Sequence, residues 1–297
     1  MFLFGLESPL KQLEVRYILQ TGLLKRPVLF FYNRYCQKRT VSHLTNYTLM
    51  VSLGMRYAVI ADIHANLEAL NAVLEDAYKR GVAEIWCLGD IVNYGPDPMA
   101  CLEILRNRKH MAVAGNHDLA VAGKINHSLF ELEAARCLVW TRNQLSSDMI
   151  DYLACLPKVT SDGDFTLVHG SLKRPEWDYI TTPQIAAENF SLMNTPYCLV
   201  GHTHMPYVFT PGQNGICRGI PLMAGSMQPL RQTSLIINPG SVGQPRDGNP
   251  QASYGIYNDE SRTFCLYRVP YNISATQKKM QKAKLPPFLS ARLSKGR

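Results

Sequence analysis

From residue 55 onward, short apolar runs alternate with amphipathic segments, and this alternation predicts strands and helices in turn. The run 57–61 has the length of a buried strand, and the segment 66–80 places its apolar residues at helical spacing. A second apolar run at 82–88 repeats the pattern. Asp97 followed by Pro98 is typical of a helix start, so a second helix is expected there. Alternation of this kind predicts a layered α/β domain.

The second half of the chain is richer in predicted strands. Apolar runs at 165–168, 198–200 and 235–237 each lead into a polar, glycine-containing turn. The runs 253–257 and 263–269 are separated by four polar residues and predict a terminal hairpin. We therefore expect the folded domain to extend from Met55 to about residue 270.

Three segments depart from this pattern. Residues 119–158 contain two stretches of helical period, 131–140 and 147–156, which predict a helical insertion that either helps to select the substrate or is purely structural. Residues 1–54 show no clean period, and we expect an N-terminal extension that is disordered or precedes the native start. Residues 271–297 are polar and lysine-rich, and we expect a loose basic tail.

The net charge of +8 does not predict a nucleic-acid-binding face. Residues 1–54 contribute +5 and residues 261–297 contribute +9, which leaves −6 for residues 55–260. The eight cysteines form no C-x-x-C pair, and several lie inside apolar runs, so we expect a reducing compartment and a cytoplasmic location. No run approaches the ~18–20 apolar residues of a membrane span, and no membrane partner is expected.

Metal-competent side chains recur just after the predicted strands. Since the carboxyl ends of neighbouring parallel strands meet at one edge of a sheet, these side chains are expected to lie together. Three oxygen donors and four imidazoles suffice for two metal sites, and such mixed donors suit divalent Mn, Fe, Zn or Ni better than Ca or Mg. The candidate ligands are Asp62, His64, Asp90, Asn116, His169, His202 and His204.

Five motifs carry a resemblance to a known family. They are Asp62-x-His64, Gly89-Asp90, Gly115-Asn116-His117-Asp118, His169-Gly170 and Gly201-His202-Thr203-His204. In this order, and with the turn 238–243, they resemble the signature of the calcineurin-like metallophosphoesterase superfamily, especially its small bacterial and archaeal phosphodiesterases. The resemblance covers residues 55 to about 269. It implies a four-layer α-β-β-α sandwich of two mixed sheets flanked by helices, with a dinuclear metal site at one sheet edge.

The resemblance also implies how the ligands are divided between the two ions. Asp90 would bridge them, and a hydroxide shared by the same ions would attack phosphorus in line with the leaving oxygen. The implied ligands of one ion are Asp62, His64, Asp90 and His204. Those of the other ion are Asp90, Asn116, His169 and His202.

Three further residues are candidates for binding the substrate or for orienting a residue that binds it. The resemblance implies that His117 faces the substrate and stabilises phosphoryl charge or protonates the departing oxygen. Asp118 would orient His117, or would only cap the following helix. Protein phosphatases of the superfamily carry an arginine soon after Gly-Asp, which is missing here. Arg246 either replaces it on the phosphate or is a solvated surface residue.

The expected function is hydrolysis of a small phosphodiester, nucleotide or related phosphate ester with two divalent transition-metal ions. Two alternatives remain open, a non-catalytic protein-binding scaffold on the same fold and a nuclease. The complete ligand set favours catalysis over the scaffold. The charge of −6 on residues 55–260 disfavours a nuclease, and a homo-oligomer stays open.

Overall fold

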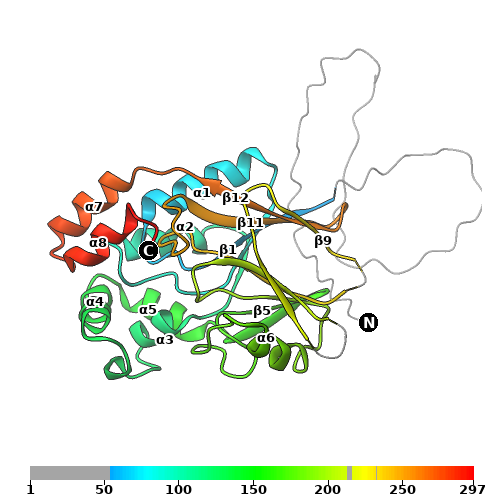
Figure 1. Ribbon diagram of the computed structural model, residues 1–297. Helices are drawn as coiled ribbons and strands as arrows, with labels where there is room; N and C mark the ends of the chain where they lie inside the picture. Colours follow the sequence, from blue (N-terminus) through cyan, green and yellow to red (C-terminus); the bar gives the residue numbers. More distant parts are fainter. Residues whose placement is uncertain (1–53, 213–215, 232) are drawn as a thin grey trace, which may run out of the picture. The chain divides into compact units, whose positions relative to one another are not determined.

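The computed structural model describes residues 54–212, 216–231 and 233–297, so the expected extension lies outside the described residues except for Gly54. Two six-stranded sheets, each with parallel and antiparallel pairs, pack against one another. Helices cover their outer faces (Figure 1). The predicted α/β sandwich of two mixed sheets flanked by helices is confirmed.

The first sheet is built around strand β1. Ala58 of β1 lies opposite Ile85 of the parallel strand β2 and opposite Ile256 of the antiparallel strand β11. The parallel half of this sheet thus comes from the first strand-helix units of the domain. In spatial order the strands are β3 (His110–Ala112), β2 (Glu84–Cys87), β1 (Arg56–Ile60), β11 (Ala252–Asn258), β12 (Thr263–Val269) and β9 (Met227–Pro229).

The second sheet has its centre at β6 and β10. Ile237 of β10 lies opposite Leu199 of the parallel strand β6 and opposite Val208 of the antiparallel strand β7. In spatial order the strands are β4 (Val159–Asp162), β5 (Phe165–Val168), β6 (Tyr197–Leu199), β10 (Leu235–Pro239), β7 (Pro206–Thr210) and β8 (Arg218–Pro221).

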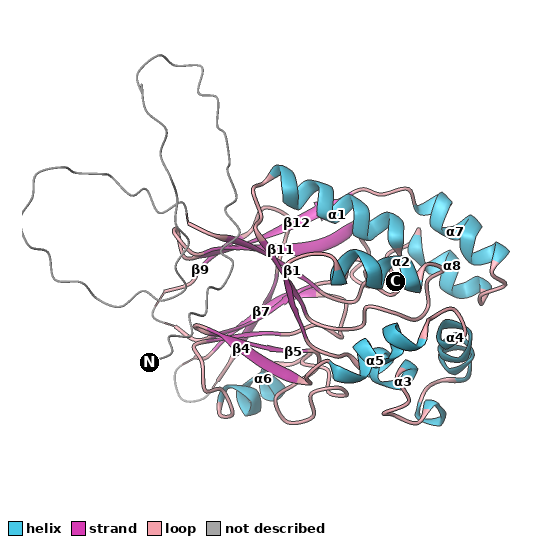
Figure 2. Ribbon diagram, turned by 180° about the vertical axis from the view of Figure 1, so that it is seen from behind, coloured by secondary structure: helices cyan, strands magenta, loops and turns pink. Residues whose placement is uncertain are grey.

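The helices occupy the two outer layers and one end of the sheets. Helix α1 lies on the outer face of the first sheet and α6 lies against the second, whereas α3, α4, α5, α7 and α8 gather at one end (Figure 2). The helices are α1 (Leu67–Lys79), α2 (Pro98–Arg106), α3 (Asn116–Val121), the 3₁₀ turn η1 (His127–Leu129), α4 (Leu132–Arg142), α5 (Ser147–Cys155), α6 (Pro183–Phe190), α7 (Ile273–Lys282) and α8 (Pro287–Leu293).

The layers follow from the two-residue period of β1. Ala58 and Ile60 point outward into the core beneath the helices, and Val59 points inward to the core between the sheets. Trp86 and Phe165, which face one another at 5.1 Å between ring centroids, fill that inner core. Burial on both faces explains why these strands read as continuous apolar runs.

The expected loose C-terminal tail is wrong for residues 273–293, which form α7 and α8 in the same compact unit as the sheets. Leu289 and Leu293 repeat at helical spacing and are buried. Lys279 pairs with Glu68 at 2.6 Å and with Asp97 at 2.9 Å. The basic composition suggested disorder, but acidic partners on the domain balance part of that charge.

Helices α4 and α5 occupy the segment in which a helical insertion was expected, and its role stays a prediction. The sequence analysis did not predict α6 or the strands β4, β7, β8 and β9.

Seven cysteines lie in the described regions and none is in a disulfide there, which is compatible with the reducing compartment that we expected. Among residues 54–212, 216–231 and 233–297, no helix has the length and apolar character needed to cross a bilayer.

Candidate metal centre

The turns after five strands bring the predicted ligands together from both sheets. The first sheet supplies the turns after β1, β2 and β3, and the second supplies those after β5 and β6. Every one of these side chains is buried, at 0–4% exposure, although each is polar. Burial of so many polar groups at one place is costly unless they bind one another or a ligand. The residues are Asp62, His64, Asp90, Asn116, His169, His202 and His204.

Five of these residues have left-handed backbones. The φ angles are +53° at Asp62, +47° at His64, +53° at Asp90, +65° at His202 and +59° at His204. Such angles are uncommon outside glycine and persist where surrounding hydrogen bonds enforce them. Asp62 N donates to Gly89 O, and His64 N donates to Asp90 O, both at 3.0 Å. The backbone is thus held in a shape that turns these side chains inward.

Gly115 allows two of the turns to touch. A Cβ atom at this position would overlap Asp90 Oδ1 and lie 2.5 Å from Asp90 N. The contact brings the turn after β3 against the turn after β2, and His117 N donates to Asp90 Oδ1 at 3.0 Å. Only glycine, which has no Cβ atom, therefore fits at this position of the Gly-Asn-His-Asp motif.

One group of candidate ligands comprises Asp62, His64 and His204, whose ligand atoms all lie within 4.8 Å of one another. His64 Nδ1 lies 3.2 Å from Val92 O, and His204 Nδ1 lies 2.6 Å from Gln244 O, so each Nδ1 carries the proton that it donates. Burial holds the pKa of both imidazoles well below its usual value. Each neutral ring therefore keeps a lone pair on Nε2.

The two Nε2 atoms lie close together in stacked rings whose planes differ by 27°. The distance between His64 Nε2 and His204 Nε2 is 3.1 Å. Two acceptors cannot form a hydrogen bond, so the contact is repulsive unless a cation lies between or beside the two nitrogens. The donor set of two imidazoles and a carboxylate fits a divalent transition metal.

A second group comprises Asp90, His169 and His202. His169 Nδ1 donates to Leu88 O at 2.8 Å, and its Nε2 lies 2.9 Å from His202 Nδ1. Burial lowers the pKa of His169, but the carboxylate of Asp90 outweighs it and raises the pKa to about 9. This group therefore attracts a positive charge.

Three atoms near this second group have no hydrogen-bond partner among the described residues. They are Asp90 Oδ2, Asn116 Oδ1 and His202 Nε2, and each is buried. Asp90 Oδ2 lies 3.3 Å from His169 Nε2 and 3.7 Å from His64 Nε2, between the two groups. An oxygen in this position fits a bridging ligand, and the unpartnered Asn116 oxygen fits a further ligand of the second group.

The expected contact between Asp118 and the His117 ring is wrong. Asp118 Oδ1 accepts from the backbone N–H groups of Ile91 and Val92, and Oδ2 accepts from that of Gly115. The carboxylate thus caps α3 and ties two turns together, as the alternative reading proposed. Burial raises the pKa of Asp118 to about 7.

The partner of His117 is Asn93, which the sequence reading missed. Asn93 Nδ2 lies 2.7 Å from His117 Nδ1. Burial lowers the pKa of His117 to about 4, so the ring is neutral at neutral pH. An amide that donates to Nδ1 places the ring proton on Nε2, which lies 3.9 Å from Asp90 Oδ2. The rings of Tyr94 and Phe130 flank His117 at 4.7 and 5.0 Å.

Arg246 lies beside the first group. Its backbone N donates to His204 O at 3.3 Å, and its Nη2 donates to Gln244 Oε1 at 2.9 Å. Nearby, the ring of Tyr179 stacks on His202 with centroids 3.9 Å apart. Arg246 is thus next to the candidate ligands and is half-buried rather than a solvated surface residue.

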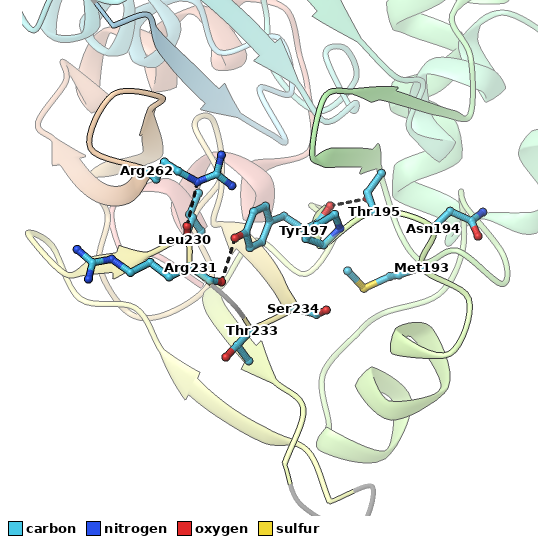
Figure 3. Close-up of a pocket in the computed structure, with 10 residues that line it drawn as sticks. Met193, Asn194, Thr195, Tyr197, Leu230, Arg231, Thr233, Ser234 and Arg262 are labelled. Carbon is cyan, nitrogen blue, oxygen red and sulfur yellow. Dashed lines mark hydrogen bonds between the residues drawn. The ribbon is translucent and has the colours of Figure 1, made fainter.

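A separate hollow lies elsewhere. A cavity of about 530 Å³ lies at the amino ends of β6 and β10, where Tyr197, Arg231 and Arg262 line it (Figure 3). Two of its polar side chains have partners, since Tyr197 Oη donates to Arg231 O at 3.1 Å and Arg262 Nη2 binds Asp164. It is remote in the fold from the metal candidates, which follow the carboxyl ends of the strands.

Comparison with known proteins agrees with the geometry. A family model described as the calcineurin-like phosphoesterase superfamily domain matches residues 55–262. The crystal structure of a metallophosphoesterase from Sphaerobacter thermophilus has a TM-score of 0.75 at 42% identity and covers 82% of this chain and 100% of its own.

Two curated proteins extend the comparison. An uncharacterised protein of Methanocaldococcus jannaschii is 38% identical over 245 residues, which is 81% of this chain and 98% of that protein. Phosphodiesterase YfcE of Escherichia coli strain K12 is 28% identical over 217 residues, which is 69% of this chain and 89% of its own.

Proposed function

The chain belongs to the calcineurin-like phosphoesterase superfamily and is a hydrolase of phosphate esters, and we propose that its substrate is a small phosphodiester, nucleotide or related ester. The observation that supports a metal-dependent reaction most strongly is the 3.1 Å approach of the Nε2 lone pairs of His64 and His204. A cation beside both nitrogens would relieve the repulsion between their lone pairs.

Two divalent ions would be held by the two groups of side chains. The shared position of Asp90 Oδ2 and the unpartnered Asn116 Oδ1 support this division. When bound, such ions activate water and offset the charge of phosphate oxygens. The proposed ligands of one ion are Asp62, His64, Asp90 and His204. Those of the other are Asp90, Asn116, His169 and His202.

His117 is the proposed hydrogen-bond donor to the leaving group. With Asn93 donating to Nδ1, the neutral ring carries its proton on Nε2, the nitrogen 3.9 Å from Asp90 Oδ2. This N–H would stabilise the charge on a departing alkoxide, which then takes its proton from water, and the aromatic rings of Tyr94 and Phe130 would limit access of bulk water. Asp118 would act as a positioning residue through the backbone of both turns.

The finer assignments follow from chemistry. Mixed imidazole and carboxylate donors support Mn, Fe, Zn or Ni as the native ions, with manganese as the first to test. The free cysteines of the described residues support a reducing compartment such as the cytoplasm. We propose a small ester rather than nucleic acid; because the basic residues 261–297 belong to the same compact unit, residues 55–297 carry a net charge of only +3.

The proposal is tested by a hydrolysis screen of the manganese-loaded protein. The substrates are bis(p-nitrophenyl) phosphate, p-nitrophenyl phosphate, cyclic nucleotides and dinucleoside polyphosphates. Turnover of at least one, lost on chelation and restored by metal, is expected. Full metal loading without turnover of any ester would favour the binding scaffold instead.

A further inference from the structure

Two arginines converge on one uncharged side chain beside the metal candidates. Arg246 Nη2 lies 2.9 Å and Arg292 Nη1 lies 3.4 Å from Gln244 Oε1. Gln244 is only 2% exposed, so its amide cannot turn freely into solvent. The two guanidiniums therefore share one neutral acceptor.

In the described part of the chain, neither guanidinium forms an ion pair with an Asp or Glu side chain. Within the described part of the chain, neither Arg246 nor Arg292 lies within 4.0 Å of an Asp or Glu oxygen. Arg246 Nε is buried and has no hydrogen-bond partner there. A half-buried guanidinium that lacks a carboxylate is a ready site for another oxyanion, because its fork of N–H groups matches a phosphate.

The position of Arg292 is fixed by the packing of α8. Leu289 and Leu293 on the same helix are buried, and Gly248 N donates to Gly296 O at 2.8 Å. Arg292 Nε also donates to Arg297 O at 2.5 Å. The C-terminal segment is thus anchored to the loop that carries Gln244 and Arg246. Both ribbon views place α8 at the same end of the sheets as α3 (Figures 1 and 2).

The two arginines lie at different depths relative to the candidate ligands. Arg246 is directly tied to a candidate ligand, because its backbone N donates to His204 O at 3.3 Å. Arg292 is on α8, and its Nε donates to Arg297 O at 2.5 Å. Arg292 is therefore the outer member of the pair.

Tyr94 lies between His117 and helix α8. Its ring lies 4.7 Å from the ring of His64 and 4.7 Å from that of His117. Its φ angle is +65°, an unusual conformation for a bulky residue that often marks a functional constraint. The same side chain packs against the cluster that contains Leu289 and Leu293, so α8, which carries Arg292, is packed close to His117.

We propose that Arg246 and Arg292 form an anion subsite that holds a second phosphate group of the substrate, beyond the one that is cleaved. This rests on the proposed function and narrows it to esters with two or more phosphate groups, such as nucleoside bisphosphates or dinucleoside polyphosphates. In this arrangement Arg246, the inner residue, is the one nearer the scissile phosphate. Arg292 on α8 binds the second phosphate group.

The test uses two esters that differ by one phosphate. One is the p-nitrophenyl ester of thymidine 5′-phosphate, and the other carries a second phosphate on the 3′ oxygen. Arg292→Gln should raise KM for the second ester ~10- to 100-fold, the usual worth of a lost charge-assisted hydrogen bond, and leave the first within ~2-fold. Lys295→Gln, which removes an exposed charge just after the same helix, should change neither.

Calorimetry gives a readout that does not need turnover. Binding of thymidine 3′,5′-bisphosphate should weaken in Arg292→Gln by the same factor, while binding of thymidine 5′-phosphate and of inorganic phosphate stays unchanged. Arg292→Lys keeps the charge and the side-chain stem, so it should recover part of the affinity and guards against misfolding of the glutamine variant.

The other outcomes have distinct meanings. Equal weakening of both nucleotides and inorganic phosphate would mean that Arg292 binds the scissile or a free anion, which overturns the second-phosphate subsite. No change in any ligand would give Arg292 a structural role only, with the same consequence. Failure of the wild-type protein to hydrolyse either ester would overturn the proposed function, and the calorimetry would still decide on the subsite.

Discussion

The two ends of the strands differ in whether their polar groups have hydrogen-bond partners. At the carboxyl ends, the candidate ligands are buried and three of their atoms lack partners among the described residues. At the amino ends lies a hollow of 530 Å³, but Tyr197, Arg262 and Asp164 there satisfy one another or the backbone. Buried polar groups in need of a partner therefore mark the functional site better than the size of a hollow does.

The largest expected effect is from Asp90→Ala. Because Asp90 Oδ2 lies between the two groups of candidate ligands, its loss should disturb both ions and lower turnover by more than the ~10²- to 10⁴-fold typical of one general acid. Elemental analysis of the purified variant measures the metals. Asp164→Ala, which removes a carboxylate at the other end of the strands, should keep both metals and full activity. Unchanged metal content in Asp90→Ala would contradict the bridging position.

The next effect is from His117→Ala. Turnover should fall ~10²- to 10⁴-fold with both metals retained. The fall should be smaller for an aryl phosphate, whose phenolate leaves without a proton, than for a nucleoside ester. His110→Ala, at the start of β3, which precedes His117 in the chain, is the matched control and should leave both rates unchanged. An equal loss on both substrates would mean that His117 only stabilises phosphoryl charge.

A smaller effect is expected from Asn93. Asn93→Ala removes the donor to His117 Nδ1 and should lower turnover of a nucleoside ester ~10- to 100-fold, as for other partners that orient functional imidazoles. Asn93→Asp should not rescue it, because a carboxylate can only accept a hydrogen bond from Nδ1–H, and the neutral ring then has no proton on Nε2. Wild-type turnover in Asn93→Asp would show that the ring tautomer does not matter.

The smallest effect is from Tyr197→Phe in the hollow. The variant loses the hydrogen bond to Arg231 O, which should cost ~0.5–1.5 kcal/mol of unfolding free energy in a denaturant titration. Turnover and metal content should stay at the wild-type values. A loss of activity in a folded variant would mean that the hollow contributes to function after all.

Much of the fold is predictable because both sheets are buried on both faces. The runs 57–61 and 165–168 stand out as strands, since polar residues follow them at once. Short strands such as β8 and β9 are largely exposed and carry no such signal. The start of helix α6 does carry a sequence signal, because Thr182 caps the helix and Pro183 follows. Its apolar stripe is weak, however.

The candidate site was predictable to the extent that it follows strand ends. Asp62, Asp90 and His169 each come after an apolar run, so topology alone brings them together. Asn93 lies mid-turn, and Arg292 lies in a segment whose composition suggested disorder. Both reach the site only through tertiary packing, which no local pattern encodes. Asp118 was assigned to the wrong partner for the same reason, because the amide groups that it binds lie 26 to 27 residues away or in its own turn.

The most direct test of the dinuclear centre is an anomalous difference map from crystals grown with manganese. Two peaks are expected, ~3.5–4 Å apart, with Asp90 between them. One should contact Asp62, His64 and His204, and the other His169 and His202. A single peak, or peaks only at the amino ends of the strands, would contradict a two-metal site at this edge of the sheets.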